Sequence, residues 1–479
     1  MTTTYDLVVL GGGAVGEVLA DRAKQGGLSV VVVEHELVGG ECSYWACMPS
    51  KALLRSGMAL RAAKSVGGSR EAATGDLDVA AVLARRNSFT HDWNDDSQVD
   101  WLDGAGIDLV RGHGRLTGVR TVEVTATDGS LLTLTANSAV AVITGSAPVI
   151  PDIPGLADVS PWTSRDATSA QSIPDSLAII GGGVVACEIA TAYASFGCTV
   201  TMLVRSDILS GNEPFAAELV GDGLTGLGVD IRRGVSATSA ERNAYGHVVL
   251  ALDDGSSLTA GEVLVATGRS PRTADIGVDS VGITPGEWLD VDDTLLVKAE
   301  TNAAEPWLYA AGDVNHRALL THQGKYQARA AGDVIAVRAT GGRVHDEPWG
   351  AHVATADHAA VPQVAFTDPE VASVGLTADA AEKAGHRIRV VDYEIGDVAG
   401  GSLQADGYTG RARAVVDEDR QVLLGVTFVG SDVAEMLQSA TIAVVGEVPL
   451  SRLWHAVPAY PTMSEVWLRL LEAYGRESA

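Results

Sequence analysis

Residues 5–34 read YDLVVLGGGAVGEVLADRAKQGGLSVVVVE, and this stretch decides the fold. Two short β-branched runs enclose a helix-like segment, as expected for parallel strands that are buried on both faces. Gly11, Gly13 and Gly16 form the pattern G-x-G-x-x-G after the first strand, and Glu34 ends the second strand. Such glycines permit a tight turn close to a pyrophosphate, and the acid can accept hydrogen bonds from ribose hydroxyls. The stretch predicts a dinucleotide-binding unit; a glycine turn without a ligand is the competing interpretation.

Residues 177–205 repeat this plan with the letters LAIIGGGVVACEIATAYASFGCTVTMLVR. Gly181, Gly183 and Ala186 form the related pattern G-x-G-x-x-A, and Arg205 ends the second strand. An acid at that place suits a free 2′-hydroxyl, whereas an arginine suits a 2′-phosphate. The second unit is therefore predicted to bind NADPH. A solvated Arg205 with NADH bound is the open alternative.

The internal repeat predicts an α/β fold with two Rossmann-like dinucleotide-binding domains and a C-terminal α+β domain. Gly145 and Gly268 each follow a predicted strand end and stand shortly before a proline, which is typical of a linker between domains. Both glycines are candidate cofactor contacts. The predicted domains are residues 1–150 with 271–347, residues 151–270, and residues 348–479.

The run GGECSYWACMPSK, residues 39–51, holds Cys42 and Cys47. Two thiols at this separation can close a small redox-active disulfide. A thiolate is the nucleophile in such chemistry, and its pKa falls near a helix N-terminus. Both cysteines are expected to open a helix over residues 51–63. The alternative is a pair of reduced core thiols.

A further signal is the run AAGDV, residues 310–314, in which Asp313 follows a predicted strand end. An acid at this position can fix a cofactor hydroxyl, although a helix N-cap is the commoner meaning of such an aspartate. The order of these motifs resembles the flavoprotein disulfide reductases, such as dihydrolipoamide dehydrogenase, glutathione reductase and mercuric reductase. The resemblance covers nearly the whole chain, and the cysteine run is similar to the family's G-G-x-C-x4-C-x-P-S-K.

The resemblance implies a role for each of these side chains. Cys42 would be the interchange thiol that meets the substrate, and Cys47 would lie against the flavin. Lys51 and Glu188 would pair near the flavin, and Asp313 would hold the ribityl chain of FAD. The C-terminal third would form the dimer interface of a homodimer, with the active site shared between two subunits.

The chain departs from this resemblance where the family has His-Pro-Thr-x-Ser-Glu. Tyr460 stands at the histidine position, and Glu465 matches the glutamate. The usual pKa is ~6.5 for histidine and ~10 for tyrosine, so a phenol is a poor proton acceptor at neutral pH. Three interpretations follow. His455 takes the base role, or the substrate is a quinone or metal ion that needs no base, or Tyr460 only fills space.

Composition limits the partners. The formal net charge of −27 repels nucleic acid and anionic membranes. Four cysteines among 479 residues do not make a disulfide-stapled secreted protein, and Cys187 and Cys198 are expected to be small buried hydrophobes. No apolar run approaches the ~20 residues that span a bilayer, and the opening MTTTYD does not resemble a signal peptide. We expect a cytoplasmic protein with no metal site.

These observations predict an FAD-dependent NAD(P)H:disulfide oxidoreductase similar to dihydrolipoamide dehydrogenase. It would relay hydride from NAD(P)H through FAD to the Cys42–Cys47 disulfide, and then reduce a small-molecule disulfide, quinone or thiol substrate. Two alternatives stay open. One is an NADPH-dependent reductase of quinones or metal ions, similar to mercuric reductase, and the other is a redox-inert flavoprotein that serves as a sensor or an assembly subunit.

Overall fold

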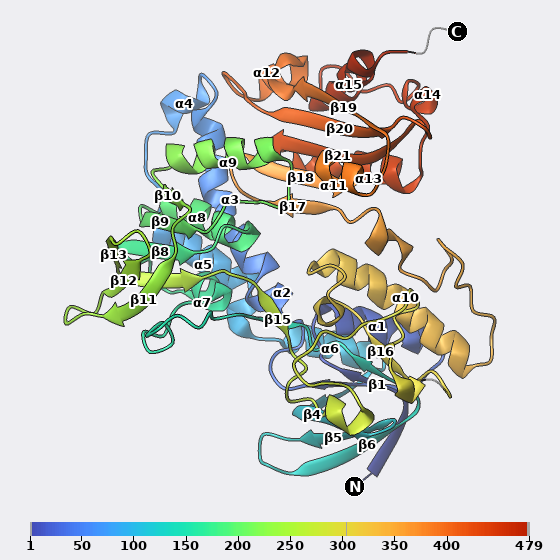
Figure 1. Ribbon diagram of the computed structural model, residues 1–479. Helices are drawn as coiled ribbons and strands as arrows, with labels where there is room; N and C mark the ends of the chain where they lie inside the picture. The colour runs from blue at the N-terminus through green and yellow to red at the C-terminus, as the bar shows by residue number, and fades with distance from the viewer. Residues whose placement is uncertain (1, 303, 477–479) are drawn as a thin grey trace. The chain divides into compact units, whose positions relative to one another are not determined.

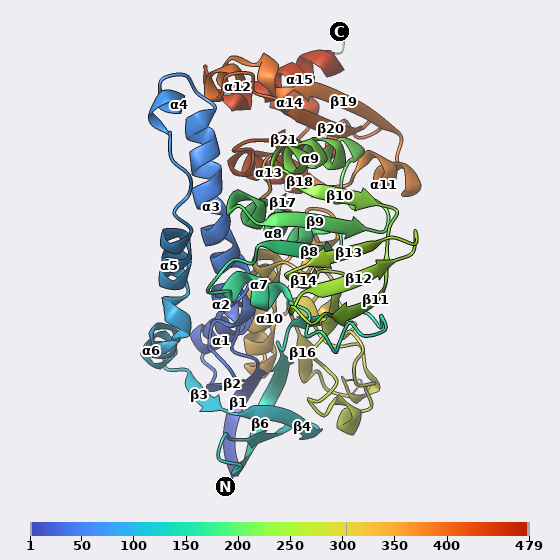
Figure 2. The same ribbon diagram turned by 90° about the vertical axis from the view of Figure 1, so that its left-hand side faces the viewer.

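The computed structural model describes residues 2–302 and 304–476, and the chain divides into two compact units. Unit 1 comprises Met1–Pro49, Asn87–Val149 and Gly268–Asp357. Unit 2 comprises Ser50–Arg86, Ile150–Thr267 and His358–Ala479. Figure 1 and Figure 2 show the elements of both units from two directions.

The centre of unit 1 is a sheet with the strand order β3-β2-β1-β6-β5-β4, in which β16 also pairs with β6. The strands are β1 (Thr2–Leu10), β2 (Val30–Glu34), β3 (Asp108–Arg111), β4 (His113–Gly118), β5 (Thr121–Thr125), β6 (Leu131–Val142) and β16 (Leu308–Ala310). β1, β2, β3, β6 and β16 pair in parallel, whereas β4 and β5 form antiparallel pairs. The apolar residues 7–10 and 30–33 are buried, because both faces of the parallel strands are covered.

Helices α1 (Ala14–Gln25) and α10 (Thr321–Ala339) pack against each other beside this sheet, as Figure 1 shows. Helix α1 turns its small and apolar residues inward, among them Leu19 and Ala23. The approach of the two helices requires a glycine on α10. A Cβ at Gly332 would lie 2.6 Å from Arg22 Cβ and 2.8 Å from the Leu19 carbonyl oxygen.

The other elements of unit 1 are short. They are α2 (Gly40–Tyr44), α6 (Asp96–Gly104), β7 (Ser146–Pro148), β15 (Arg269–Pro271), η1 (His91–Trp93), η2 (Val278–Val281), η3 (Glu300–Asn302) and η4 (Asp313–Asn315). Three elements continue from one unit into the other: α3 (Cys47–Lys64), α5 (Val79–Phe89) and η5 (Thr355–His358).

Unit 2 contains a parallel sheet of the order β10-β9-β8-β14 and an antiparallel sheet of the order β11-β12-β13. Figure 2 shows the two sheets next to each other. Their strands are β8 (Ser176–Ile180), β9 (Thr199–Val204), β10 (Asp230–Arg233), β11 (Ala237–Arg242), β12 (Val248–Leu252), β13 (Ser257–Ala260) and β14 (Glu262–Val265). The helices of this part are α4 (Ser69–Ala72), α7 (Ser164–Ser169), α8 (Val184–Ser195) and α9 (Pro214–Gly226).

The C-terminal part of unit 2 is built on an antiparallel sheet of the order β17-β18-β21-β20-β19. Its strands are β17 (Gln363–Ala365), β18 (Glu370–Gly375), β19 (Ile388–Glu394), β20 (Arg411–Asp417) and β21 (Val422–Gly430). The central strand β21 is buried along its whole length. The helices are α11 (Ala378–Lys383), η6 (Ile395–Asp397), α12 (Ala399–Gln404), η7 (Ala434–Met436), α13 (Leu437–Val445), α14 (Leu450–Leu453), η8 (Met463–Glu465) and α15 (Val466–Tyr474).

The predicted mixed α/β fold is confirmed, with one local correction. The helix expected over residues 51–63 begins at Cys47 and ends at Lys64, and Cys42 lies in the separate short helix α2. Pro49 does not delay the helix, because a proline in the first turn lacks only an N–H that would have no intrahelical partner. Among the described residues, no helix is long and apolar enough to cross a membrane.

Candidate functional site

The glycine turn of unit 1 is pressed against neighbouring backbone. Gly11 has φ +109°, and a Cβ there would lie 2.4 Å from the Ile143 carbonyl oxygen, so only glycine fits. A Cβ at Gly16 would lie 2.0 Å from the Gly11 carbonyl oxygen. Gly13 is the N-cap of α1, and none of the described side chains caps this helix end. The first N–H groups of α1 are therefore available to an anion, which the helix dipole also favours.

Glu34 ends β2 with its carboxylate turned toward backbone N–H groups. The Gly12 N–H donates to Oε2 at 2.7 Å, and the Glu36 N–H donates to Oε1 at 2.7 Å. His35 Nδ1 lies 3.4 Å from Oε1. Burial acts to raise the pKa of Glu34, but hydrogen bonds from His35, Glu36 and Gly12 outweigh it and hold the pKa below its usual value. Glu34 is therefore ionised at neutral pH and can accept further hydrogen bonds.

Gly145 and Asp313 lie near each other because the strands before them are neighbours. β6 and β16 run parallel, and each residue stands three positions beyond its strand. Ser146 Oγ donates to Asp313 Oδ2 at 2.5 Å, and Arg269 Nε donates to Ser146 Oγ at 2.6 Å. Arg269 Nε also lies 3.8 Å from Asp313 Oδ2. The serine and the arginine together hold the Asp313 carboxylate in place.

Gly268 belongs to the same region of unit 1. It directly precedes β15, which pairs antiparallel with β7, the strand that directly follows Gly145. Within 4 Å of a Cβ built at either glycine there is no heavy atom beyond its chain neighbours among the described residues. A ligand that binds beside the paired strands β7 and β15 would need this open space.

The cysteine run lies directly on the glycine turn. The Gly39 N–H donates to the Gly12 carbonyl at 2.8 Å, and a Cβ at Gly40 would lie 2.9 Å from Gly13 Cα. The glycine pair before the cysteines therefore permits a close approach of two backbone segments. Whatever binds at the turn must lie beside the cysteine run.

Cys42 and Cys47 are both half-buried thiols. Cys47 Sγ lies 3.3 Å from Oγ1 of Thr321, the first residue of α10. The pKa of Cys42 is raised, mainly by its hydrogen bond with Cys47 and by burial, and the charge of Cys47 adds to this. Thr321 and the charge of Lys325 act in the opposite direction. The two thiols therefore share one proton-binding environment, in which ionisation of one opposes ionisation of the other.

The predicted partners Lys51 and Glu188 are paired within unit 2. Lys51 Nζ donates to Glu188 Oε2 at 2.8 Å, and the Phe366 N–H donates to Oε1 at 2.9 Å. The ammonium also lies 4.7 Å from the centroid of the Phe366 ring. Both carboxylate oxygens of the buried Glu188 thus have a donor.

The second glycine turn repeats the features of the first. A Cβ at Gly181 would lie 2.3 Å from the Ala266 carbonyl oxygen, and Gly183 caps α8 without a hydrogen bond from any described side chain. Ala186 is fully buried in α8. Arg205 follows β9 and is exposed. The residues predicted for the second cofactor therefore lie at one end of the parallel sheet of unit 2.

The C-terminal residues Tyr460 and Glu465 differ sharply in burial. Tyr460 is 76% exposed, whereas Glu465 is buried. Arg469 NH2 donates to Glu465 Oε1 at 2.6 Å, and Oε2 is a buried acceptor without a hydrogen-bond partner in the described part of the chain. His455 is exposed and, like Tyr460, makes no side-chain hydrogen bond to Glu465 among residues 2–302 and 304–476.

Several contacts of the candidate site in unit 1 could not be predicted from the sequence. Ser146, Arg269 and Thr321 contact residues that are more than 100 positions away along the chain. The only local signal is that Arg269 directly follows Gly268. Cys187 and Cys198 are buried, as expected, and burial raises the pKa of each thiol to about 12.

Comparison with protein families defines the class. Residues 5–334 match the model of the pyridine nucleotide-disulphide oxidoreductases, and residues 361–471 match the dimerisation domain of that family. The chain therefore belongs to the pyridine nucleotide-disulphide oxidoreductase family, whose members depend on FAD and use NAD(P)H as electron donor. It is a flavoprotein disulfide reductase. The redox-inert alternative is not supported.

Individual relatives point in two directions. Dihydrolipoyl dehydrogenase from Thermus scotoductus is 32% identical over 482 residues, which cover 99% of this chain and 98% of that protein. Mercuric reductase from Staphylococcus aureus is 29% identical over 465 residues, which cover 96% of this chain and 81% of that protein. A similar fold is found in the Cu(II) complex of the HOCl-induced flavoprotein disulfide reductase RclA from Escherichia coli, with a TM-score of 0.82. The two sequences are 23% identical, and the match covers 98% of this chain and 99% of that chain.

Proposed function

We propose that this chain is an FAD-dependent NAD(P)H:disulfide oxidoreductase similar to dihydrolipoamide dehydrogenase. The observation that carries the proposal is the hydrogen bond from Gly39 to Gly12, which fixes the cysteine run on the glycine turn. FAD, when bound there, supplies a hydride acceptor that can pass two electrons to a neighbouring disulfide. In balance, NAD(P)H and one proton convert the Cys42–Cys47 disulfide into two thiols and NAD(P)⁺. The dithiol then reduces the substrate disulfide by exchange.

The residues of unit 1 fit FAD in this role. The uncapped N-terminus of α1 suits the pyrophosphate, and ionised Glu34 suits the ribose hydroxyls. Asp313, beside Gly145 and Gly268, would hold the ribityl chain. Cys42 would exchange with the substrate, and Cys47 would face the flavin.

The nicotinamide cofactor proposed is NADPH, with NADH as the alternative. Arg205 is exposed at the end of β9, where the cofactor's 2′ position is expected, and no described side chain neutralises it by an ion pair. Lys51 and Glu188 would lie near the flavin. We assign FAD binding to residues 1–150 and 271–347, NAD(P)H binding to 151–270, and the interface to 348–479.

The chain carries the family's dimerisation domain, and we propose a homodimer. Tyr460 and Glu465 of one subunit would line the substrate side of the cysteine pair of the other. A tyrosine that is 76% exposed suits a surface that a second copy covers. The low cysteine content favours the cytoplasm as its compartment.

A second candidate is an NADPH-dependent reductase of quinones or metal ions. It is favoured by Tyr460 at the position where the family has its base and by the lack of a hydrogen bond between His455 and Glu465 in the described residues. Turnover of menadione that survives Cys42→Ser would select this candidate.

Replacement of Cys47 tests the main proposal. A thiolate that lies against oxidised flavin gives a long-wavelength absorption band, so Cys47→Ser should abolish this band in the two-electron-reduced enzyme. Cys198→Ser is the matched control and should keep it, because Cys198 is a buried thiol of a hydrophobic core and lies outside the cysteine run. An unchanged band in Cys47→Ser would overturn the assignment.

A further inference from the structure

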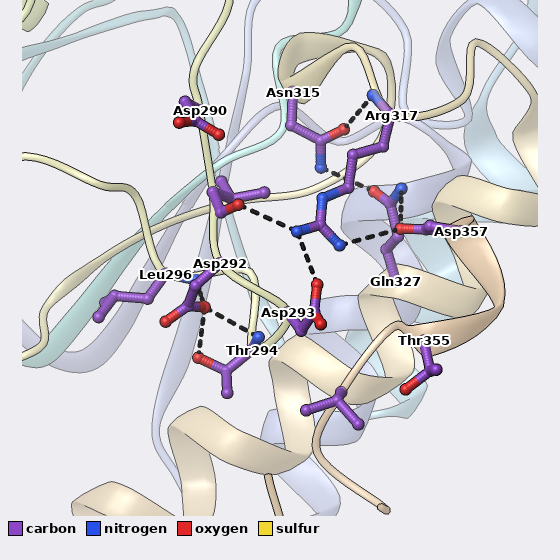
Figure 3. Close-up of polar contacts among 12 residues, drawn as sticks. Asp290, Asp292, Asp293, Thr294, Leu296, Asn315, Arg317, Gln327, Thr355 and Asp357 are labelled. Carbon is purple, nitrogen blue, oxygen red and sulfur yellow. Dashed lines mark hydrogen bonds and ion pairs between the residues drawn. The ribbon is translucent and has the colours of Figure 1, made fainter. Parts of the chain in front are cut away.

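A buried polar network in unit 1 has no part in the chemistry described so far. Figure 3 labels four of its members, Asn315, Arg317, Gln327 and Asp357, which come from η4 and the residues after it, from α10, and from the segment that ends unit 1. We call it the Asp357 network, and its members are Asn315, Arg317, Gln323, Gln327 and Asp357.

Gln327 connects the Asp313 segment to Asp357. Its Oε1 accepts from the Gly312 N–H at 2.8 Å and from Asn315 Nδ2 at 2.9 Å. Its Nε2 donates to Asp357 Oδ2 at 3.0 Å. One side chain therefore holds the backbone before Asp313 and the side chain two residues after it.

Asp357 in turn fixes the orientation of Gln327. Its Oδ1 accepts from Gln323 Nε2 at 2.6 Å, and its Oδ2 lies 3.5 Å from Arg317 NH1. Arg317 NH2 also donates to Asp293 Oδ1 at 2.9 Å, as Figure 3 shows. Asp357 can only accept while it is ionised, so the Gln327 amide must turn its nitrogen to Asp357 and its oxygen to Gly312.

Burial makes this orientation compulsory. Gln327 is 0% exposed, and the side chain of Asp357 is 1% exposed. Burial raises the pKa of Asp357, while the hydrogen bond from Gln323, the charge of Arg317 and the hydrogen bond from Gln327 act against that rise. Neither side chain can replace a lost partner by bulk water, so a break at Asp357 is transmitted to Gly312.

We propose that Gln327 and Asp357 are positioning residues that set the place of Asp313 for the flavin. They act through the Gly312 N–H and the Asn315 amide, on the two sides of Asp313. This inference rests on the proposed role of Asp313 as a ligand of the FAD ribityl chain. It predicts that FAD affinity depends on residues that touch no cofactor.

The test is the dissociation constant for FAD, measured by reconstitution of the full-length apoprotein, with apoprotein thermal unfolding followed in parallel. Gln327→Met and Asp357→Asn should each weaken FAD binding about tenfold or more, because each leaves buried groups without partners. The exchanged double variant Gln327→Glu with Asp357→Asn should recover most of the affinity. In it, the new carboxylate on α10 would still accept from the Gly312 N–H, and the new amide on η5 would donate to that carboxylate.

Thr294→Val is the matched control. Thr294 is also buried in unit 1 and donates to Asp292 Oδ1 at 2.8 Å, without a hydrogen bond to residues 312–315 among the described residues. It should lower thermal stability and leave FAD affinity unchanged. Equal loss of affinity in Thr294→Val, or no recovery in the exchanged variant, would overturn the inference.

Asp313→Ala separates this inference from the proposed function. Weaker binding in Asp313→Ala together with wild-type affinity in Gln327→Met would refute the positioning role alone. Wild-type affinity in Asp313→Ala would instead refute the FAD ligand assignment on which the inference rests.

Discussion

The pair Lys51–Glu188 predicts an asymmetric response to mutation. The side chain of Glu188 is 6% exposed, whereas that of Lys51 is 37% exposed. Lys51→Met would leave Glu188 Oε2 buried without its donor. Breaking a fully buried pair costs roughly 3–5 kcal/mol. The partial exposure of Lys51 reduces this, and we expect a loss of about 2 kcal/mol in the free energy of unfolding.

Glu188→Gln should cost less than the lysine variant. The glutamine can keep an oxygen toward the Phe366 N–H, and the partly exposed ammonium can turn to water. We expect a loss below about 1 kcal/mol, close to that of surface ion pairs. The direction of the asymmetry follows from burial alone, because the same ion pair is removed in both variants.

Urea unfolding of the two single variants and of the double variant measures the effect. Lys298→Met is the matched control, because Lys298 forms an exposed pair with Asp290 at 3.2 Å and should show almost no change. A loss in Glu188→Gln equal to or greater than that in Lys51→Met would refute the reasoning, since Glu188 would then not be the desolvated partner.

Two further predictions concern the cofactor and pH. Arg205→Ala should raise the KM for NADPH at least about tenfold and leave the KM for NADH unchanged, because only NADPH has a 2′-phosphate. Steady-state kinetics with both cofactors would check this. An equal change of KM for both cofactors would contradict it. Burial raises the pKa of Glu17 from 4.5 to about 7, and the charge of Lys325 opposes this rise only in part. The folded protein therefore holds the Glu17 proton more tightly than the unfolded chain does. The resulting stabilisation is fully present below pH 4.5 and is lost as the pH rises to about 7. Glu17→Gln should therefore flatten the decline of the unfolding temperature between pH 4.5 and about pH 7, and an unchanged decline would show that another group causes it.

The candidate site residues that the sequence predicts are those with local patterns. Glu34 could be named because the spacing from the glycine turn places it at the end of the next parallel strand. The start of the next helix was predicted less well, because it was expected at residue 51 and lies at Cys47, with Pro49 inside the first turn. Where a pattern is local, its meaning depends only on a few neighbouring residues.

The residues that the sequence did not identify have partners far away along the chain. Ser146 contacts Asp313 across 167 positions, and Thr321 contacts Cys47 across 274. Serine and threonine are common on any surface, so their identity carries no signal until the fold brings the partners together. The same holds for Gln327, which reads as an ordinary helix residue in the sequence but is fully buried and linked to Gly312.

This chain differs from its family pattern at Tyr460, which stands at the position of the family's histidine. Glu465 has Arg469 on one oxygen, so the charge that could support a protonated base is already balanced by an arginine. Tyr460 is exposed and makes no side-chain hydrogen bond to Glu465 among the described residues. Thr321 and Lys325 in unit 1, by contrast, both favour the ionised form of Cys42. The hydrogen bond with Cys47 and burial outweigh these two groups of helix α10, so the pKa of Cys42 is raised on balance. A thiol that holds its proton at neutral pH is a poor nucleophile, and the contacts in unit 1 therefore do not remove the need for a proton acceptor at Cys42.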